Sequence, residues 1–311
     1  MVSRSDFETA VAGVRAVVRD PIAGLYGPDS HVWRINREAV IFLGGGRAAL
    51  LQLAHPVVAQ AVSDHSTTRT DPIGRFQRTF EIVFAMVYGD LDSACAAARR
   101  VRAIHERILG VLPARVGAYA EGTPYAANLP DALLWVHATL WDTSIQVYEL
   151  VMGELPLDVK AAYYEETKRF ARLFGVPEDI LPATWTDFQR YCQGMYGSPQ
   201  LTVGAPAAEM GRFLLDPSRT RLGPAWSWYG MMTAGLLPER LRQAYGLDYG
   251  ALERRMFDGS IAALRTTWWL LPLVTRYLPA YLEGQWRMAG VVGGHPMTAV
   301  MDRLLRFGLR G

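Results

Sequence analysis

Apolar residues recur at the 3.6-residue spacing of amphipathic helices along most of this chain, and the alternating pattern of strands is almost absent. The first clear helix starts at Asp71 and Pro72, because aspartate is a good N-cap and proline suits the first helical position. It ends at Gly89, and its stripe is Phe76, Phe80, Val83 and Val87. A second helix is predicted from Asp90 or Asp92 to Leu109, ended by Gly110, with the stripe Ala94, Ala97, Val101, Ile104 and Ile108.

Similar patterns predict further helices over residues 47–54, 132–151, 156–174, 182–191, 238–245 and 252–271. Two segments rich in glycine and proline, 194–206 and 223–238, are short and apolar, so we expect ordered loops rather than linkers. The chain is therefore predicted to be a single all-α domain over residues 1–311. After about residue 200 the sequence shows no recognisable chemistry, and residues 196–311 are expected to form a helical C-terminal extension that completes the core or an access channel.

The amino-acid composition indicates a globular protein and argues against several classes of partner and cofactor. Half of the 311 residues are hydrophobic and 20% are charged, which is ordinary for a globular protein with a large core. The net charge of +2 gives no reason to expect nucleic acid as a partner. The two cysteines form no CxxC pair, and no CxxCH motif for covalent haem attachment is present. No prediction of oligomeric state follows from these patterns.

The first ten residues include Arg4, Asp6 and Glu8 and contain no apolar run, so we expect no secretory signal and a cytoplasmic protein. The longest apolar segment, 266–280, is too short to span a membrane and contains two prolines and Arg276. We expect a buried core helix there, and peripheral contact with a membrane surface is the alternative.

Most familiar catalytic motifs are absent. There is no GxSxG elbow, and His105-Glu106 does not continue as HExxH because residue 109 is leucine. The run Gly44-Gly45-Gly46-Arg47 lacks the Lys-Ser/Thr of a phosphate loop, so a glycine-rich entry into a helix is the better interpretation. The remaining candidates are the histidines, namely His31, His55, His65, His105, His137 and His295.

His105 is the histidine with the most suggestive surroundings. Arg102 lies three residues earlier on the same helical face, among small and aliphatic residues that would let a flat ligand approach closely. On the preceding helix Arg75, Arg78 and Thr79 share one face and could line the other side of a pocket. The alternative is a solvated face with a surface arginine pair. His55, His65 and His137 are interpreted as structural, the first two at helix ends and the third in the core.

Several motifs occur together: Gly44 to Pro56 (GGGRAALLQLAHP), Asp64-His65-Ser66, Asp71-Pro72 with Arg75 and Arg78-Thr79, Val101-Arg102-Ala103-Ile104-His105, and Trp135-Val136-His137-Ala138-Thr139-Leu140. Over about residues 39–195 the chain resembles the catalytic domain shared by bacterial rubber oxygenase (latex clearing protein) and the fungal oxygenase MpaB. The resemblance implies a globin-like helical core around non-covalently bound haem b. It implies that His105 is the axial iron ligand, that Arg102 supports it, and that Arg75 and Thr79 lie on the distal side.

Arg78 departs from the pattern, because the rubber oxygenases have a lysine there that can occupy the distal iron position. A guanidinium stays protonated and is a poor iron ligand, so the sixth position is expected to be open, water-bound or taken by another group. The connection between the two helices is also a few residues shorter, so rubber is not the expected substrate.

Three functions follow as hypotheses. The first is a haem oxygenase that uses dioxygen on an apolar unsaturated substrate, isoprenoid or lipid-like, with Arg75, Arg78 and Thr79 shaping the distal side. The second is a non-catalytic helical protein that binds haem or lipid. The third is a haem-free helical enzyme that acts on an anionic small molecule.

Overall fold

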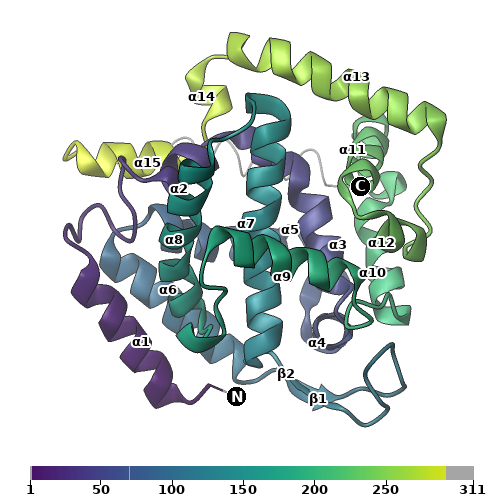
Figure 1. The fold of residues 1–311 in the computed structure, drawn as a ribbon, viewed down its shortest axis with the longest axis horizontal. Coiled ribbons are helices and arrows are strands. Elements are labelled where there is room, and N and C mark those ends of the chain that lie inside the picture. Colours follow the sequence, from purple (N-terminus) through teal and green to yellow (C-terminus); the bar gives the residue numbers. More distant parts are fainter. Residues whose placement is uncertain (1, 70, 292–311) are drawn as a thin grey trace.

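The computed structural model describes residues 2–69 and 71–291, and this part of the chain is all-α apart from one small hairpin (Figure 1). The elements up to the hairpin are α1 (Arg4–Val17), α2 (His31–Asn36), α3 (Gly45–Leu53), α4 (Pro56–His65), α5 (Pro72–Tyr88), α6 (Leu91–His105), β1 (Leu109–Val111) and β2 (Pro124–Ala126). They are followed by α7 (Pro130–Met152), α8 (Leu157–Phe174), α9 (Trp185–Gly197), α10 (Ala205–Leu215), α11 (Gly223–Leu236), α12 (Glu239–Ala244), α13 (Ala251–Thr267), α14 (Leu273–Arg276) and α15 (Pro279–Met288). The main core joins side chains from α1 to α15, which confirms the prediction of an all-α domain.

Helix α7 runs through the middle of the molecule and packs against α3, α8, α9 and α13 (Figure 1). Trp135, Ala138 and Val147 on different sides of it are fully buried. A helix that is apolar on all sides is stable only when it is surrounded, which explains its central place. The indole of Trp135 donates a hydrogen bond to the carbonyl of Leu51 (2.8 Å), which joins α7 to α3.

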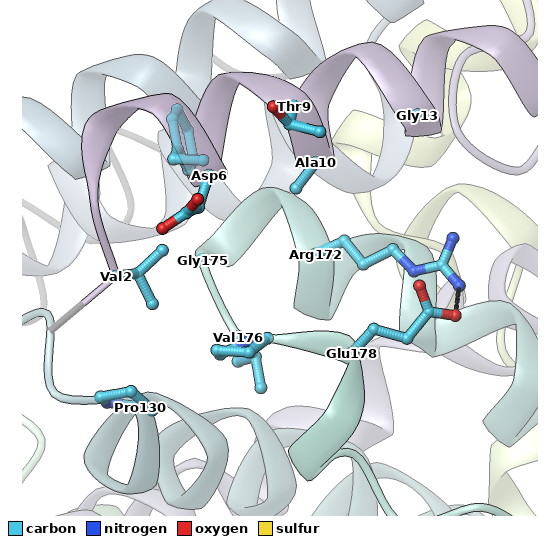
Figure 2. A pocket seen from close by; sticks show the side chains of 12 residues that line it. Val2, Asp6, Thr9, Ala10, Gly13, Pro130, Arg172, Gly175, Val176 and Glu178 are labelled. Atoms are coloured by element: carbon cyan, nitrogen blue, oxygen red, sulfur yellow. Dashed lines mark hydrogen bonds and ion pairs between the residues drawn. The ribbon is translucent and has the colours of Figure 1, made fainter.

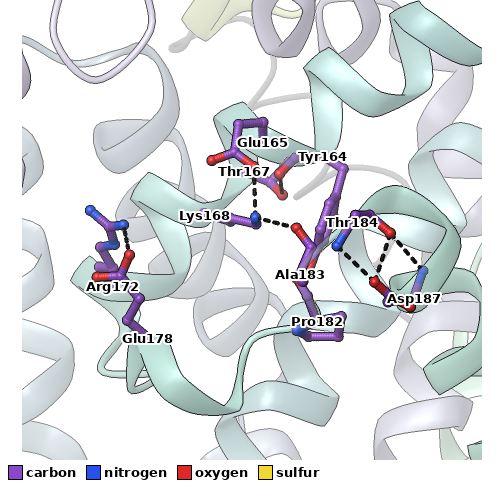
Figure 3. A network of polar contacts seen from close by, with 10 residues as sticks. All are labelled: Tyr164, Glu165, Thr167, Lys168, Arg172, Glu178, Pro182, Ala183, Thr184 and Asp187. Carbon is purple, nitrogen blue, oxygen red and sulfur yellow. Dashed lines mark hydrogen bonds and ion pairs between the residues drawn. The ribbon is translucent and has the colours of Figure 1, made fainter.

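Polar contacts hold α8 against the segment that leads into α9 (Figure 3). The Lys168 ammonium donates to the Ala183 carbonyl (2.8 Å) and to the Glu165 carboxylate (2.6 Å), and the Tyr164 hydroxyl donates to the Pro182 carbonyl (2.6 Å). These contacts fix the middle of α8 to the segment that leads into α9.

The three glycines before Arg47 allow helices to approach closely. A Cβ on Gly44 would clash with Thr143 of α7, and one on Gly46 would clash with Thr233 of α11. The backbone N–H of Gly46 donates to the Tyr229 hydroxyl (2.7 Å). The run therefore serves packing, in agreement with the interpretation that it is not a phosphate loop.

The end of α6 differs from the prediction. The helix stops at His105 instead of Leu109, and residues 109–111 pair with residues 124–126 as an antiparallel hairpin that the sequence pattern did not indicate. Ile104 is 46% exposed and Ile108 lies beyond the helix, so the buried stripe ends at Val101. Pairing between residues so far apart in sequence has no local signal, and it prevails here over the helical spacing of Ile104 and Ile108.

The C-terminal half also differs in two places. Residues 223–236, predicted as part of a loop, form helix α11, which opens with a proline near its first position. Residues 266–280 are not a buried helix: α13 ends at Thr267, a 3₁₀ turn spans Trp268–Leu270, and the side chains from Trp269 to Thr275 are exposed.

No single helix in residues 2–69 and 71–291 is long and apolar enough to cross a membrane. One bent pair of helical segments, Ala39–Leu53 with Pro56–His65, passes by length and composition only.

Candidate functional site

The antiparallel packing of α5 and α6 brings the beginning of one helix beside the end of the other. Arg75 lies about 14 residues before the turn at Gly89, and His105 about 15 residues after Asp90, so both lie at similar heights on the helix pair. Asp71 caps α5 by accepting from the Gly74 N–H (2.9 Å), and Asp90 caps α6 by accepting from the Ser93 N–H (2.7 Å). Local capping and the tight turn therefore set the geometry of this region.

His105 is the last residue of α6, four residues after Val101, where the fully buried stripe of the helix ends. Its ring is partly buried and meets the Phe174 ring edge-on, with 5.8 Å between centroids. Burial lowers the pKa of His105 to about 4, the positive charges of Arg75 and Arg102 contribute in the same direction, and a hydrogen bond with Asn128 opposes the shift. The imidazole is therefore neutral at neutral pH, and its Nδ1 atom is buried with no hydrogen-bond partner.

Arg75 and Thr79 are held together as the sequence predicted for one helical face. The Arg75 guanidinium donates to the hydroxyl of Thr79 and to the hydroxyl of Ser66 (3.2 Å), and the Thr79 hydroxyl donates to the Arg75 carbonyl (2.8 Å). Burial, and then the charge of Arg78, lower the pKa of Arg75, but a guanidinium remains protonated at any ordinary pH. Arg75 is thus a fixed, half-buried positive charge whose field reaches His105.

Arg78 points elsewhere. Its guanidinium donates to the Asp71 carboxylate (3.0 Å) and to the Thr67 hydroxyl (3.0 Å), at the exposed start of α5. The side chains of this ion pair are 46% and 51% exposed. The structure thus brings Arg75 and Thr79 together, but it uses Arg78 to tie the helix start to the preceding turn.

Arg102 connects the site to the N-terminal helix. Its guanidinium donates to the Glu106 carboxylate (3.0 Å) and to the Val2 carbonyl (2.6 Å), and it lies 5.8 Å from the centre of the Phe7 ring. The Nη1 atom is buried without a partner. Arg102 and His105 therefore each keep one buried nitrogen unpaired on neighbouring positions of α6.

A pocket of about 580 Å³ adjoins this region between α1 and the loop after α8 (Figure 2). Val2 and Phe7, the two contacts of Arg102 on the N-terminal segment, line it, and Gly175 follows Phe174 on the opposite wall. An Arg172–Glu178 ion pair lies at one side. None of the five residues predicted from the sequence lines this pocket.

Sequence reasoning missed Asn128, Phe174 and Ser66. Asn128 is buried and reaches His105 because the hairpin folds back, with the Ala127 N–H donating to the Ile108 carbonyl (3.1 Å). Phe174 comes from α8, which packs on α6. Ser66 belongs to the Asp64-His65-Ser66 motif, and that motif was the only indication in the sequence that any of these three residues lies at the site.

The other histidines have structural contacts. His55 is buried and pairs with the Tyr119 hydroxyl (3.0 Å), and the His65 Nε2 lies 3.2 Å from the Leu109 carbonyl. His137 is fully buried in α7, and its Nδ1 accepts from the Trp141 indole (2.8 Å). These contacts agree with the structural roles predicted for all three, whereas His295 lies outside the described residues.

All five predicted residues fall inside the segment that matches known proteins. The family described as the ER-bound oxygenase mpaB/B'/rubber oxygenase catalytic domain matches residues 32–266, more than half of the chain. This chain belongs to that family. The match confirms the resemblance seen in the motifs and extends it beyond residues 39–195 at both ends.

Two relatives of this mpaB/rubber oxygenase domain are uncharacterized proteins, one from Mycobacterium bovis and one from Mycobacterium tuberculosis. Each is 24% identical over 233 residues, which cover 72% of this chain and 87% of the relative. No solved structure matches the chain. The globin-like arrangement of the core therefore stays a prediction.

The residues around His105 fit a haem group by the chemistry of their donors. Among the described residues no cluster of three or more His, Cys, Asp or Glu is placed to hold a metal ion, but haem iron requires only one axial side chain. A neutral imidazole with an unpaired buried nitrogen provides that ligand. The unpaired Nη1 of Arg102 provides a donor for a carboxylate.

Proposed function

We propose that this protein is a haem-dependent oxygenase in which His105 is the axial ligand of non-covalently bound haem b. Membership of an oxygenase family supports the reaction class. The observation that carries the haem assignment is the neutral His105 imidazole, with its Nδ1 buried and unpaired, beside the charges of Arg75 and Arg102. His55 and His137 also have an unpaired buried ring nitrogen and a lowered pKa, but burial alone lowers it there, with no contribution from an arginine.

Each residue of the site has a distinct task in this proposal. His105 offers a nitrogen lone pair, because its low pKa keeps the ring unprotonated, and Phe174 limits how the ring turns. Arg102 and Arg75 bind carboxylate or other anionic groups through charge-assisted hydrogen bonds. Bound haem would supply the redox-active iron at which dioxygen is activated. Thr79 and Ser66 keep the Arg75 guanidinium in place, so its charge needs little reorganisation during the reaction.

The substrate class follows from the walls of the site. Phe174 meets the His105 ring, and the buried Ala98 and Val101 precede His105 on α6, so the side chains near the site are apolar and favour an apolar ligand over a charged one. We therefore propose an unsaturated isoprenoid or lipid-like substrate, whose carbon–carbon double bond reacts with dioxygen.

The visible absorption spectrum of the purified full-length protein, titrated with haem, tests the cofactor. We expect a strong Soret band in the wild type that collapses or shifts in His105→Ala. His31→Ala is the matched control, because the His31 ring pairs with Arg34 on the same helix, α2 (2.9 Å), outside the α5–α6 pair that holds the site, and it should keep the wild-type band.

Oxygen uptake with unsaturated lipids then separates the remaining functions. Haem binding with substrate-dependent uptake supports the oxygenase. Haem binding without uptake on any unsaturated lipid indicates a non-catalytic protein that binds haem or lipid. Absence of a Soret band after titration rejects the haem assignment and favours a haem-free enzyme that uses Arg75 on an anionic small molecule.

A further inference from the structure

The segment from the end of α13 to the start of α14 lies at one edge of the molecule (Figure 1), and its large apolar side chains are exposed. We call residues 269–274 the apolar loop. Its exposed fractions are 55% for Trp269, 80% for Leu270, 41% for Leu271, 54% for Leu273 and 57% for Val274. Scattered exposed apolar residues are normal on protein surfaces, but a contiguous group of this kind marks an interaction site.

A buried ionic contact fixes both ends of the apolar loop. The Glu38 carboxylate accepts from the Trp268 indole (2.9 Å) before the loop and from the Arg276 guanidinium (2.9 Å) after it. All three residues are buried. The Arg276 guanidinium also lies 4.6 Å from the centre of the Trp269 ring. The contacts of Glu38 with Trp268 and Arg276 thus hold both ends of the apolar loop against the core, and the residues between them remain exposed.

The charges near the apolar loop indicate which kind of surface it binds. Residues 266–275 contain no charged side chain. The last turn of α13 exposes Arg265 beside the loop, and residues 259–282 contain no acidic side chain. An uncharged apolar projection with an exposed arginine at its edge and no carboxylate in the adjoining chain suits a bilayer with anionic lipids, in which tryptophan prefers the interface.

We infer that the apolar loop is a docking site for the surface of an anionic lipid bilayer. A stable contact with another protein usually needs about 20–30 residues on each side, far more than this loop offers. Insertion into lipid needs no complementary partner surface, and 80% exposure of Leu270 shows that the loop projects. The inference does not depend on haem, and the loop lies outside the segment 32–266 that defines the family.

Co-sedimentation of the full-length protein with vesicles tests the inference. Vesicles of phosphatidylcholine with about one third phosphatidylglycerol are compared with pure phosphatidylcholine. We expect binding that is stronger to the anionic vesicles, and a loss of about tenfold or more in Leu270→Ser/Leu273→Ser. Leu109→Ser/Val111→Ser is the matched control, because these side chains are 53% and 58% exposed on β1, at the opposite end of the molecule from α13 and α14 (Figure 1), and it should bind as the wild type does.

Circular dichroism shows whether the serine variants keep the wild-type fold, which is expected because both leucines are exposed. Equal binding of the loop variant and the wild type would overturn the inference, as would a wild type that pellets with neither vesicle. Sedimentation velocity supplies one more outcome. A dimer that the loop substitutions abolish, without vesicle binding, would assign the loop to contact with a second copy of the chain.

Discussion

Replacing Arg47 by methionine removes the centre of a buried polar network that joins four helices. Its guanidinium donates to the Asp142 carboxylate (2.8 Å), the Tyr196 hydroxyl (2.8 Å), the Leu236 carbonyl (3.0 Å) and the Thr143 hydroxyl. Methionine keeps much of the volume of the side chain but none of its donors. The substitution therefore tests electrostatics more than packing.

The loss of unfolding free energy in Arg47→Met depends on the environment of the Asp142 carboxylate, which loses its partner. The side chains of Arg47 and Asp142 are only 3% and 18% exposed, so the remaining carboxylate has little water to replace its partner. It keeps the hydroxyl of Tyr196 as a donor (2.6 Å). Removing one partner of a buried ion pair typically costs about 3–5 kcal/mol, and we expect a value near 3 kcal/mol because that hydroxyl remains.

The double variant Arg47→Met/Asp142→Leu supplies the decisive comparison. Removing both charges should recover at least half of the loss, because no buried charge is then left without a partner. Urea denaturation followed by far-UV circular dichroism gives the unfolding free energies. A loss below about 1 kcal/mol in Arg47→Met, or additive losses in the double variant, would refute this account of the network.

Three further predictions concern packing, pH and the departure at Arg78. Gly46→Ala should lower the unfolding free energy by about 1–3 kcal/mol because its methyl group meets Thr233, and Thr233→Ala should restore part of it in thermal denaturation; no rescue would contradict the close approach of the helices. Burial lowers the pKa of His137 to about 3, so stability present above pH 6.5 should decline as the pH falls from 6.5 towards 3, with a slope of at most about 1.4 kcal/mol per pH unit from this group. His137→Gln should flatten that slope in urea titrations at pH 7 to 4.5, and an unchanged slope would assign it to other groups. Arg78→Ala should cost less than about 1 kcal/mol and leave any Soret band unchanged, because its ion pair is exposed; loss of the band would place Arg78 at the haem.

Much of the fold was readable from local patterns. Asp71 and Asp90 correctly predicted where α5 and α6 begin. Gly175, in a left-handed conformation, ends α8 at the predicted position. Caps of this kind act over three or four residues, so a sequence displays them directly. The hairpin after His105 was missed, because its strands are three residues each and their pairing joins positions 13 to 17 residues apart.

The residues of the candidate site could be predicted from the sequence only in part, because some of them come together through contacts between segments that are distant in the chain. The spacing of Arg75 and Thr79 on one helix, and of Arg102 and His105 on the next, was visible in the sequence. Asn128 and Phe174 reach His105 through the return of the hairpin and the packing of α8 on α6, and neither leaves a mark in local spacing.

The sequence by itself determined about half of the helices, most of the ends of those it predicted, the family motifs and the residues that share one helical face, since these depend on neighbours within one or two turns. Only the tertiary structure decided that Arg78 turns to Asp71 and away from Arg75, and that the apolar residues after α13 lie at the surface. The first outcome is a choice between partners near Arg78 in the chain, and the second depends on a partner that is distant in the sequence. Arg78 finds a carboxylate at the helix start, and Glu38, more than 200 residues earlier in the chain, binds Trp268 and Arg276 and leaves the residues between them outside.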